Sequence, residues 1–336
     1  MAAQEMTINI GSVELPIPVL LAPMSGVTDL PFRRLVKSWG AGLVFSEMIA
    51  SPGMVNSNQK TLKMIENCSE EQPLAIQLAG YDPEAMAFAA KLCEEKGAAI
   101  IDINMGCPVK KIVKKQAGSA LMRDLVLARR IIDATVRSVD VPVTLKMRMG
   151  WDDEHLNAPE LAQVAEDCGV QLLTVHGRTR CQFYNGAADW RFIKNVVDAV
   201  KLPVIVNGDI RNYDDVDEAL KMSGAAGVMI GRGATGRPWF PGQVMHYLAT
   251  GERLAEPPPT TRAEIITHHI KELVCHFGDH AGLRIARKHI SWYSKGIGAP
   301  SLISSKINRL NSVSDVLNEI NKYFCGDPVN LNDVIG

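Results

Sequence analysis

Eight short apolar runs recur along this 336-residue chain, and each is followed by a loop and a helix-like segment. The runs are nearly continuous rather than alternating, which is typical of strands buried on both faces of a parallel sheet. Eight strand–helix units within about 250 residues predict an α/β fold, a closed (β/α)8 or TIM barrel. They are VLLAPM from Val19, GLVFSEM from Gly42, LAIQLAG from Leu74, AIIDINMG from Ala99, VPVTLKMRMG from Val141, LLTVHGR from Leu172, LPVIVNGDI from Leu202 and GVMIGRG from Gly227.

Capping signals support helices between these runs. Asp82-Pro83-Glu84 supplies an N-cap, a proline at the first helical position and an acid in the first turn. The pattern that follows ends at Gly97, a residue type favoured just past a helix end. A second helix start is expected around Asn212 and Asp214.

The two ends of the chain differ from this repeat. The segment TINI-GS-VEL before the first run predicts a two-residue hairpin that closes the bottom of the barrel. Glu256-Pro257-Pro258-Pro259 is a stiff break, and three helical patterns follow it: AEIITHHIKELVCHF, LRIARKHISWYSKG and SVSDVLNEINKYF. We therefore expect a barrel domain at residues 1–255 and a small all-helical C-terminal domain at residues 260–336.

Composition excludes several classes of protein. With 46% hydrophobic and 22% charged residues, the chain is not disordered. A net charge of −1 excludes coating of nucleic acid by bulk positive charge but allows local basic patches. Seven scattered cysteines without a CxxC pair favour reduced thiols in a cytoplasmic protein. The N-terminus lacks a secretory signal, and the uncharged run from Leu15 to Thr28 is too short to span a membrane.

Candidate site residues lie where each apolar run turns polar, because a barrel of this kind places its active site at the C-terminal ends of its strands. No pair of carboxylates suggests an acid/base couple. His276 and His280 lie four apart without a third ligand, so we expect no metal. The candidates are Pro23, Met24, Ser25, Gln77, Asn104, Cys107, Lys146, His176, Arg178, Arg180, Asn207, Gly208, Asp209, Gly231 and Arg232.

The segment GRGATG, from Gly231 to Gly236, matches the dinucleotide pattern G-x-G-x-x-G. A dinucleotide fold would need a further parallel strand ending in an acid, and none follows. A phosphate site built from the seventh and eighth loops fits better, with Arg232 adding a charge-assisted hydrogen bond. A plain turn is the alternative.

Lys146 ends a buried strand, where an amine is costly unless it meets an anion. A reduced flavin with its phosphate would supply that anion, and Gln77 could hydrogen-bond the polar edge of the ring. The turn Ala22 to Ser25 would support one ring face. The alternative is a lysine that extends to solvent.

Cys107 follows the fourth run in Asp102-Ile-Asn-Met-Gly-Cys-Pro108, on a loop that reaches over the barrel mouth. We expect four nearby lysines, at positions 110, 111, 114 and 115, to lower the pKa of its thiol and make it a proton donor. A small buried cysteine is the alternative. The lysines themselves are expected either to contact RNA phosphates or to be solvated.

Taken together and in order, the motifs of this chain resemble those of bacterial tRNA-dihydrouridine synthases of the B-type branch. The resemblance runs from Ala22 to Tyr293 and is most specific in the cysteine-centred stretch and in HGRTR. The matching pieces are APMSGVTDLPFR, SEM, QLAG, DINMGCPVKKIVKKQAGSAL, LKMRMGW, HGRTR, NGDI, MIGRGATGRPW and RIARKHISWY.

The resemblance implies FMN in the barrel mouth, NADPH as electron donor and tRNA as substrate. NADPH would reduce FMN, hydride would pass to C6 of a D-loop uridine that has left its stack, and Cys107 would protonate C5. Asn104, His176 and Arg178 would face the flavin and the uracil. The implied FMN-binding residues are Pro23, Met24, Ser25, Gln77, Lys146, His176, Asn207, Gly208, Asp209, Gly231 and Arg232.

The resemblance also implies that the helical domain holds the tRNA, and a monomer is the default assembly. Trp292 and Tyr293 would either stack on bases or pack between helices. The residues expected to hold the RNA backbone are Arg178, Arg180, Arg284, Arg287 and Lys288, with the four lysines of the Cys107 loop.

Two other functions stay open on sequence grounds. A small-molecule pyrimidine flavin dehydrogenase of the dihydroorotate type would have no affinity for tRNA. A non-catalytic tRNA-binding protein would bind no flavin.

Overall fold

The computed structural model describes residues 6–56, 58–66, 68–295 and 300–325. The chain forms two compact units. One comprises the chain up to Ala234 together with Trp239–Arg253, and the other comprises Thr235–Pro238 and the chain from Leu254 onward. Among the described residues, no helix is both long enough and apolar enough to cross a membrane.

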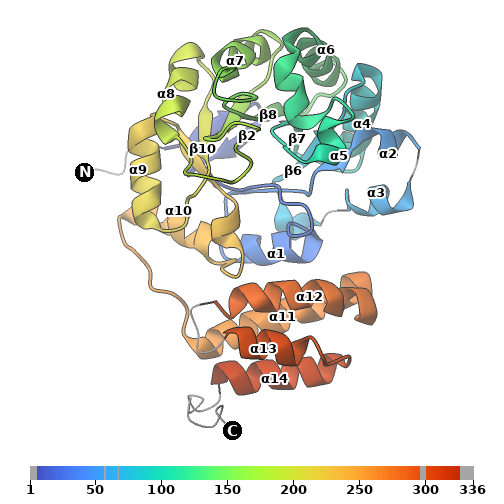
Figure 1. The fold of residues 1–336 in the computed structure, drawn as a ribbon, viewed down its shortest axis with the longest axis vertical. Helices are drawn as coiled ribbons and strands as arrows, with labels where there is room; N and C mark the ends of the chain where they lie inside the picture. Colours follow the sequence, from blue (N-terminus) through green and yellow to red (C-terminus); the bar gives the residue numbers. More distant parts are fainter. Residues whose placement is uncertain (1–5, 57, 67, 296–299, 326–336) are drawn as a thin grey trace. The chain divides into compact units, whose positions relative to one another are not determined.

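The first unit is a closed barrel of eight parallel strands (Figure 1). The strands follow the order β4-β3-β11-β10-β9-β8-β7-β6, and a further pairing of β4 with β6 closes the ring. Every residue of these eight strands is buried, which explains their continuous apolar character. The predicted TIM barrel is therefore confirmed. The strands are β3 (Val19–Leu21), β4 (Leu43–Phe45), β6 (Leu74–Ala79), β7 (Ile100–Met105), β8 (Val143–Arg148), β9 (Leu172–His176), β10 (Val204–Asn207) and β11 (Gly227–Ile230), with a short β5 (Ile49–Ala50) added to β6.

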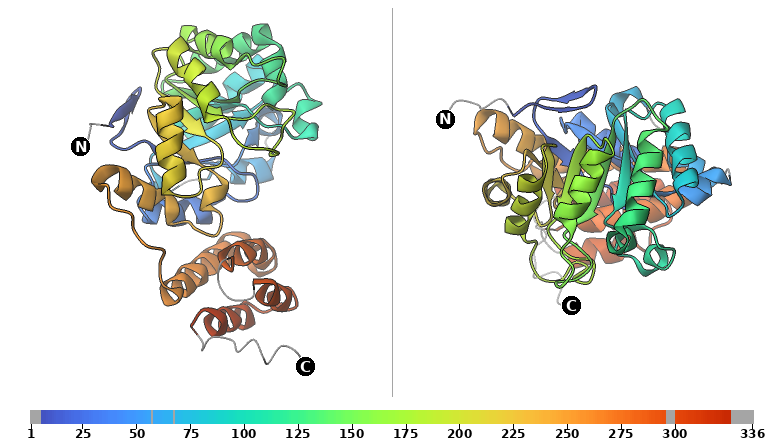
Figure 2. Two further views of the ribbon diagram at one scale, coloured as in Figure 1. Left: turned by 60° about the vertical axis from the view of Figure 1, so that its left-hand side comes forward. Right: turned by 90° about the horizontal axis from the view of Figure 1, so that it is seen from above.

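Helices follow the strands and surround them (Figure 2). The expected caps are present: the Asp82 side chain accepts a hydrogen bond from the Glu84 amide at 3.2 Å, and Asn212 forms a capping box with Asp215. The α-helices are α1 (Leu30–Ser38), α2 (Ser51–Val55), α3 (Gln59–Lys63), α4 (Pro83–Glu95), α5 (Lys110–Val113), α6 (Leu125–Val136), α7 (Ala158–Asp167), α8 (Trp190–Ala199), α9 (Tyr213–Ser223) and α10 (Phe240–Thr250). Short 3₁₀ turns are η1 (Ser69–Glu71), η2 (Gly118–Arg123) and η3 (Arg232–Ala234).

A hairpin closes the N-terminal end of the barrel, as predicted. Strands β1 (Ile8–Ile10) and β2 (Val13–Leu15) pair antiparallel across a two-residue turn. Ile10 and Leu15 are buried in one cluster with the first residues of several barrel strands, among them Leu43, Ile100 and Leu172. The hairpin thus supplies apolar side chains to the end of the barrel opposite the predicted site.

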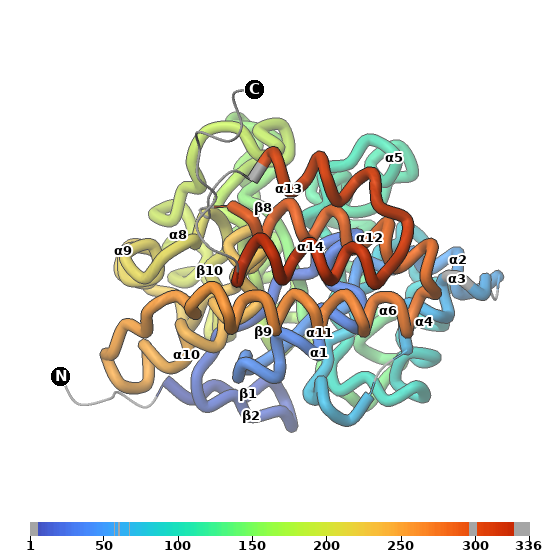
Figure 3. The backbone as a smooth tube through the Cα atoms, turned by 90° about the horizontal axis from the view of Figure 1, so that it is seen from below, coloured from blue at the N-terminus to red at the C-terminus, as the bar shows by residue number. Residues whose placement is uncertain are grey.

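The second unit consists of helices that pack side by side (Figure 3). Helix α11 (Pro259–Phe277) packs against α12 (Asp279–Tyr293) and α14 (Val313–Cys325), and α13 (Pro300–Ile307) packs against α12 and α14. Gly282 permits the close approach of α12 to α11, because a Cβ there would lie 2.6 Å from Cα of Val274. Helix α13, which is short and begins at a proline, was not predicted.

Candidate active site

The register of the parallel strands brings the polar candidates together at their C-terminal ends. Each candidate sits near the end of its own strand, so neighbours in the sheet become neighbours in the site. The candidates pair with one another or with Asp102 and Arg148, for which no role was predicted: Gln77 with Asp102, Asn104 with Lys146, Arg148 with His176, and His176 with Asn207.

A chain of hydrogen bonds links a buried acid to the cysteine loop. Nε2 of Gln77 donates to Oδ2 of Asp102 at 2.7 Å, and Nδ2 of Asn104 donates to Oε1 of Gln77 at 2.8 Å. Oδ1 of Asn104 accepts from the backbone amide of Cys107 at 2.9 Å. Gln77 and Asn104 were predicted as site residues, whereas no role was predicted for Asp102. The sequence did contain a signal for Asp102, because this carboxylate lies two residues before the candidate amide Asn104 in the same apolar run.

Lys146 is buried and does not extend to solvent. Its Nζ donates to Oδ1 of Asn207 at 3.0 Å. Within the described part of the chain, no carboxylate forms an ion pair with this amine. Burial, helped by the charge of Arg148, lowers the pKa of Lys146 to about 8, although the charge of Asp102 acts in the opposite direction. The site therefore contains a buried amine that a bound anion would complete.

His176 is a neutral imidazole at the end of β9. Burial lowers its pKa well below the usual value, and the charges of Arg148, Lys146 and Arg178 act in the same direction. A neutral ring offers one N–H donor and one acceptor nitrogen. His176 is therefore suited to hydrogen bonding rather than to carrying charge.

The Cys107 thiol is half-buried, and its pKa is raised rather than lowered as expected. Burial is the main cause, and the opposing charges of Arg148 and Lys146 do not outweigh it. The carbonyl of Cys107 accepts from Oγ of Ser119 at 2.8 Å, which fixes the loop. At neutral pH the sulfur therefore keeps its proton, as a proton donor requires.

The solvent exposure of the four lysines near Cys107 explains why the predicted direction of the thiol's pKa shift was wrong. They lie on α5 and just after it, and all four are exposed to solvent. Water and salt screen exposed charges, so they do not contribute appreciably to the thiol's environment. Their contact with RNA stays a prediction.

The buried Arg178 forms an ion pair with the partly exposed Asp209 that organises the loop after β9. Nη2 of Arg178 lies 2.5 Å from Oδ2 of Asp209 and 2.7 Å from the carbonyl oxygen of Gly186. Burial tends to raise the pKa of Asp209, but the hydrogen bonds from Arg178 and Ala188 and the nearby guanidinium charges lower it overall. The Arg178 side chain is only 1% exposed, so its partners here are protein groups, and its contact with RNA or flavin stays a prediction.

Arg232, predicted to bind phosphate, also pairs with Asp209, at 2.9 Å. Its guanidinium lies 4.9 Å from the ring centre of Tyr184, which is exposed at the mouth of the site. Gly231 faces the turn after β3, where an added Cβ would lie 3.5 Å from Cβ of Ala22. The eighth loop thus lies beside the turn that holds Pro23, Met24 and Ser25.

Arg180 stacks on aromatic rings instead of extending freely. Its guanidinium carbon lies 4.6 Å from the ring centre of Trp151 and 5.4 Å from that of Phe183. Arg123 stacks on Trp151 as well, at 4.2 Å. This cluster of arginines and aromatic rings spans the loops after three strands and was not predicted.

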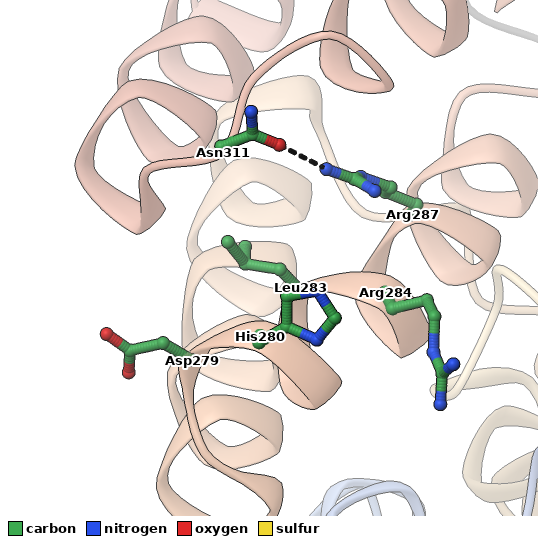
Figure 4. A pocket seen from close by; sticks show the side chains of 6 residues that line it. All are labelled: Asp279, His280, Leu283, Arg284, Arg287 and Asn311. Atoms are coloured by element: carbon green, nitrogen blue, oxygen red, sulfur yellow. Dashed lines mark hydrogen bonds between the residues drawn. The ribbon is translucent and has the colours of Figure 1, made fainter.

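In the helical unit, a cavity of about 430 Å³ contains two of the predicted RNA-binding residues (Figure 4). Nη2 of Arg287 donates to the carbonyl oxygen of Leu310 at 2.8 Å and to Oδ1 of Asn311 at 3.3 Å. Arg284 is exposed. The cavity is lined by Asp279, His280, Leu283, Arg284, Arg287 and Asn311.

Two further residues of α12, Lys288 and Tyr293, differ in their exposure to solvent. Lys288 is exposed, with its Nζ 5.5 Å from the ring centre of Trp292. Tyr293 is buried and hydrogen-bonds Nδ1 of His269 at 3.0 Å, so it packs between helices. Among the residues that the structure describes, no three His, Cys, Asp or Glu side chains form a group that could hold a metal.

The fold and the site define a TIM-barrel protein with a buried amine, a neutral imidazole and a protonated thiol at its mouth. A similar fold occurs in a 2-naphthoyl-CoA reductase complex, with a TM-score of 0.53 and 12% identity over 71% of this chain and 51% of that one. The family model for dihydrouridine synthases (Dus) matches residues 20–325. The chain belongs to the dihydrouridine synthase family, which confirms the resemblance inferred from its motifs.

Named relatives agree with this assignment over nearly their whole length. The probable tRNA-dihydrouridine synthase of Rickettsia bellii is 51% identical over 318 residues, covering 94% of this chain and 98% of the relative. tRNA-dihydrouridine synthase B of Xanthomonas campestris is 45% identical, covering 94% and 95%. The enzyme of the same name from Pseudomonas aeruginosa is 43% identical, covering 94% and 96%.

Proposed function

We propose that this chain reduces a D-loop uridine of tRNA to dihydrouridine, using FMN and NADPH, with Cys107 as the acid. The observation that carries the proposal is the convergence of the buried Lys146 amine and the protonated Cys107 thiol at one barrel mouth, in a chain of the dihydrouridine synthase family. The family supplies the reaction class, and the side chains supply the groups that the reaction needs.

The residues at the mouth fit a flavin phosphate cofactor. Lys146 is a buried cation held by an amide oxygen, so an electron-rich ring would complete its environment. Gln77 lies on β6, separated from Lys146 on β8 by strand β7. The turn from Pro23 to Ser25 lies beside Gly231 of the eighth loop. Bound FMN, with NADPH as the source of electrons, would supply a hydride for C6 of the uracil.

The proton comes from this chain. Reduction of the C5=C6 bond adds hydride at C6 and a proton at C5, and the Cys107 thiol holds such a proton at neutral pH. The thiolate left behind lies within the field of Arg148 and Lys146, whose charges favour it. Because Cys107 is half-buried rather than sealed, solvent can return the proton.

The tRNA would be held by both domains. We assign the barrel at residues 1–255 to catalysis and the helical domain at residues 260–336 to RNA binding. The exposed residues Arg284 and Lys288 and the lysines of the Cys107 loop can reach phosphates. The target base must leave its stack to enter the mouth.

Replacing Cys107 by alanine tests the proposed acid. The Cys107→Ala variant should bind FMN and oxidise NADPH at wild-type levels, because the thiol contributes only the proton. Dihydrouridine formation should fall by about two to four orders of magnitude. The measurement is mass mapping of dihydrouridine in tRNA after incubation with each enzyme.

Cys181→Ala is the matched control, since this exposed thiol lies in the loop after β9. It should leave the rate unchanged. Normal dihydrouridine formation by Cys107→Ala would show that another group is the acid. A colourless purified protein that binds tRNA would instead overturn the enzymatic function.

A further inference from the structure

We infer that Asp102 is a positioning residue that fixes the orientation of the Gln77 and Asn104 amides and, through them, the loop that carries Cys107. The inference rests on the proposed function for its catalytic meaning. Its structural content rests on an unbroken hydrogen-bonded chain from β7 through β6 and back to the end of β7.

The chain begins at a group that can only accept. Asp102 is buried and accepts from Oγ1 of Thr144 at 2.6 Å and from Nε2 of Gln77 at 2.7 Å. An ionised carboxylate has no hydrogen to donate, so both partners must point hydrogens at it. Burial raises the pKa of Asp102 to about 6, while the two hydrogen bonds and the charge of Lys146 oppose the rise, so the group is mainly ionised at neutral pH.

The orientation then passes from one amide to the next. Because the Gln77 nitrogen faces Asp102, its Oε1 is the atom that meets Asn104, and it accepts from Nδ2 at 2.8 Å. The oxygen of Asn104 is thereby turned to the loop. It accepts from the backbone amides of Gly106 at 3.2 Å and Cys107 at 2.9 Å. One carboxylate thus decides which atom each amide presents.

This orientation has a chemical consequence at the mouth. Each amide retains one N–H that the chain does not use, and Lys146 adds its ammonium hydrogens. The groups next to the Cys107 loop are therefore donors, which suits the carbonyl oxygens of a flavin or a uracil. Reversed amides would present acceptors to those oxygens and leave two loop N–H groups without their acceptor.

The test compares variants that cut different hydrogen bonds of the same carboxylate. Asp102→Ala removes the start of the chain, and Gln77→Leu removes its second link while Asp102 remains. Thr144→Val is the matched control, because it removes the other hydrogen bond of Asp102 and leaves Gln77 oriented. Asp102→Asn should keep Cys107 alkylation closer to the wild-type level than Asp102→Ala does. The asparagine oxygen can still accept from Gln77, while its nitrogen donates to Oγ1 of Thr144.

The readout is the alkylation of Cys107 by iodoacetamide as a function of pH, followed by mass spectrometry of its peptide in protein without substrate. With the loop released, the thiol becomes more exposed. We therefore expect its alkylation midpoint to fall and its rate at neutral pH to rise about tenfold in Asp102→Ala and Gln77→Leu. Thr144→Val should behave as wild type.

Unchanged alkylation in folded Asp102→Ala would overturn the inference and leave Asp102 a structural residue. If that variant does not fold, Gln77→Leu decides the question in the same way. A rise in Thr144→Val equal to that in Asp102→Ala would also overturn it, since general loosening of the barrel would then be the cause. Failure of the wild-type protein to modify tRNA would refute the proposed function without altering these results.

Discussion

At the scale of the residue, the burial of the Lys146 amine is unfavourable without an anionic ligand. Its amine is buried, and its Nζ donates to Oδ1 of Asn207. We expect Lys146→Met to fold at least as stably as the wild type in protein stripped of cofactor, because the change removes a buried charge. Affinity for FMN should fall about tenfold to a hundredfold, as measured by quenching of flavin fluorescence.

The pH dependence of the stripped protein gives a second measure of the same residue. Burial lowers the pKa of Lys146 from 10.5 to about 8, so between these values the unfolded chain binds the extra proton. The contribution of Lys146 to stability therefore rises with pH across this window. Thermal melts should show this rise in the wild type and less of it in Lys146→Met, with Lys201→Met as an exposed control. An identical rise in both proteins would contradict the assignment.

At the scale of the element, helices α11 and α12 pack around two buried histidines. The rings of His269 and His289 lie 4.6 Å apart, and burial lowers the pKa of His269 from 6.5 to about 3. The unfolded chain therefore takes up a proton first as the pH falls. The free energy of unfolding of this helical unit should decrease from about pH 6.5 downward toward pH 3.

His269→Phe should reduce this acid sensitivity, because phenylalanine fills a similar volume and does not titrate. Urea unfolding followed by circular dichroism across the same pH window measures it. His280→Gln serves as the control, since His280 is exposed at the start of α12. Equal pH slopes in wild type and His269→Phe would assign the acid sensitivity to other groups.

At the scale of the whole molecule, the net charge of −1 conceals local basic surfaces. We expect tRNA affinity to fall steeply with salt, because phosphate contacts release counterions. Arg284→Ala and Lys288→Ala should each lower the slope of log K against log salt by about one. Lys322→Ala, an exposed lysine of α14, should leave the slope unchanged. Filter binding at several salt concentrations gives these slopes, and a flat response would refute docking through phosphates.

Local patterns were sufficient to predict the barrel and to place several of the candidate residues at one end of it. Continuous apolar runs identified all eight barrel strands, because each strand is buried on both faces. The polar residues near the ends of the runs, such as Gln77 and Lys146, could be placed close together because parallel strands end at one edge. The helix α13 was missed because eight residues with a weak apolar pattern give little periodic signal.

Only the tertiary structure decided how each of these side chains is used. Burial set the direction of the pKa shift of Cys107, whereas the sequence showed only nearby lysines that turn out to be exposed. Packing of the loop after β9 gave Arg178 an ion pair with Asp209, 31 positions further along the chain. Asp102 acquired its role through strands β6 and β8 on either side of it. The sequence determined which groups reach the barrel mouth, because the apolar runs mark where each strand ends. Solvent exposure and long-range contacts, which only the tertiary structure shows, determined the protonation and orientation of these groups.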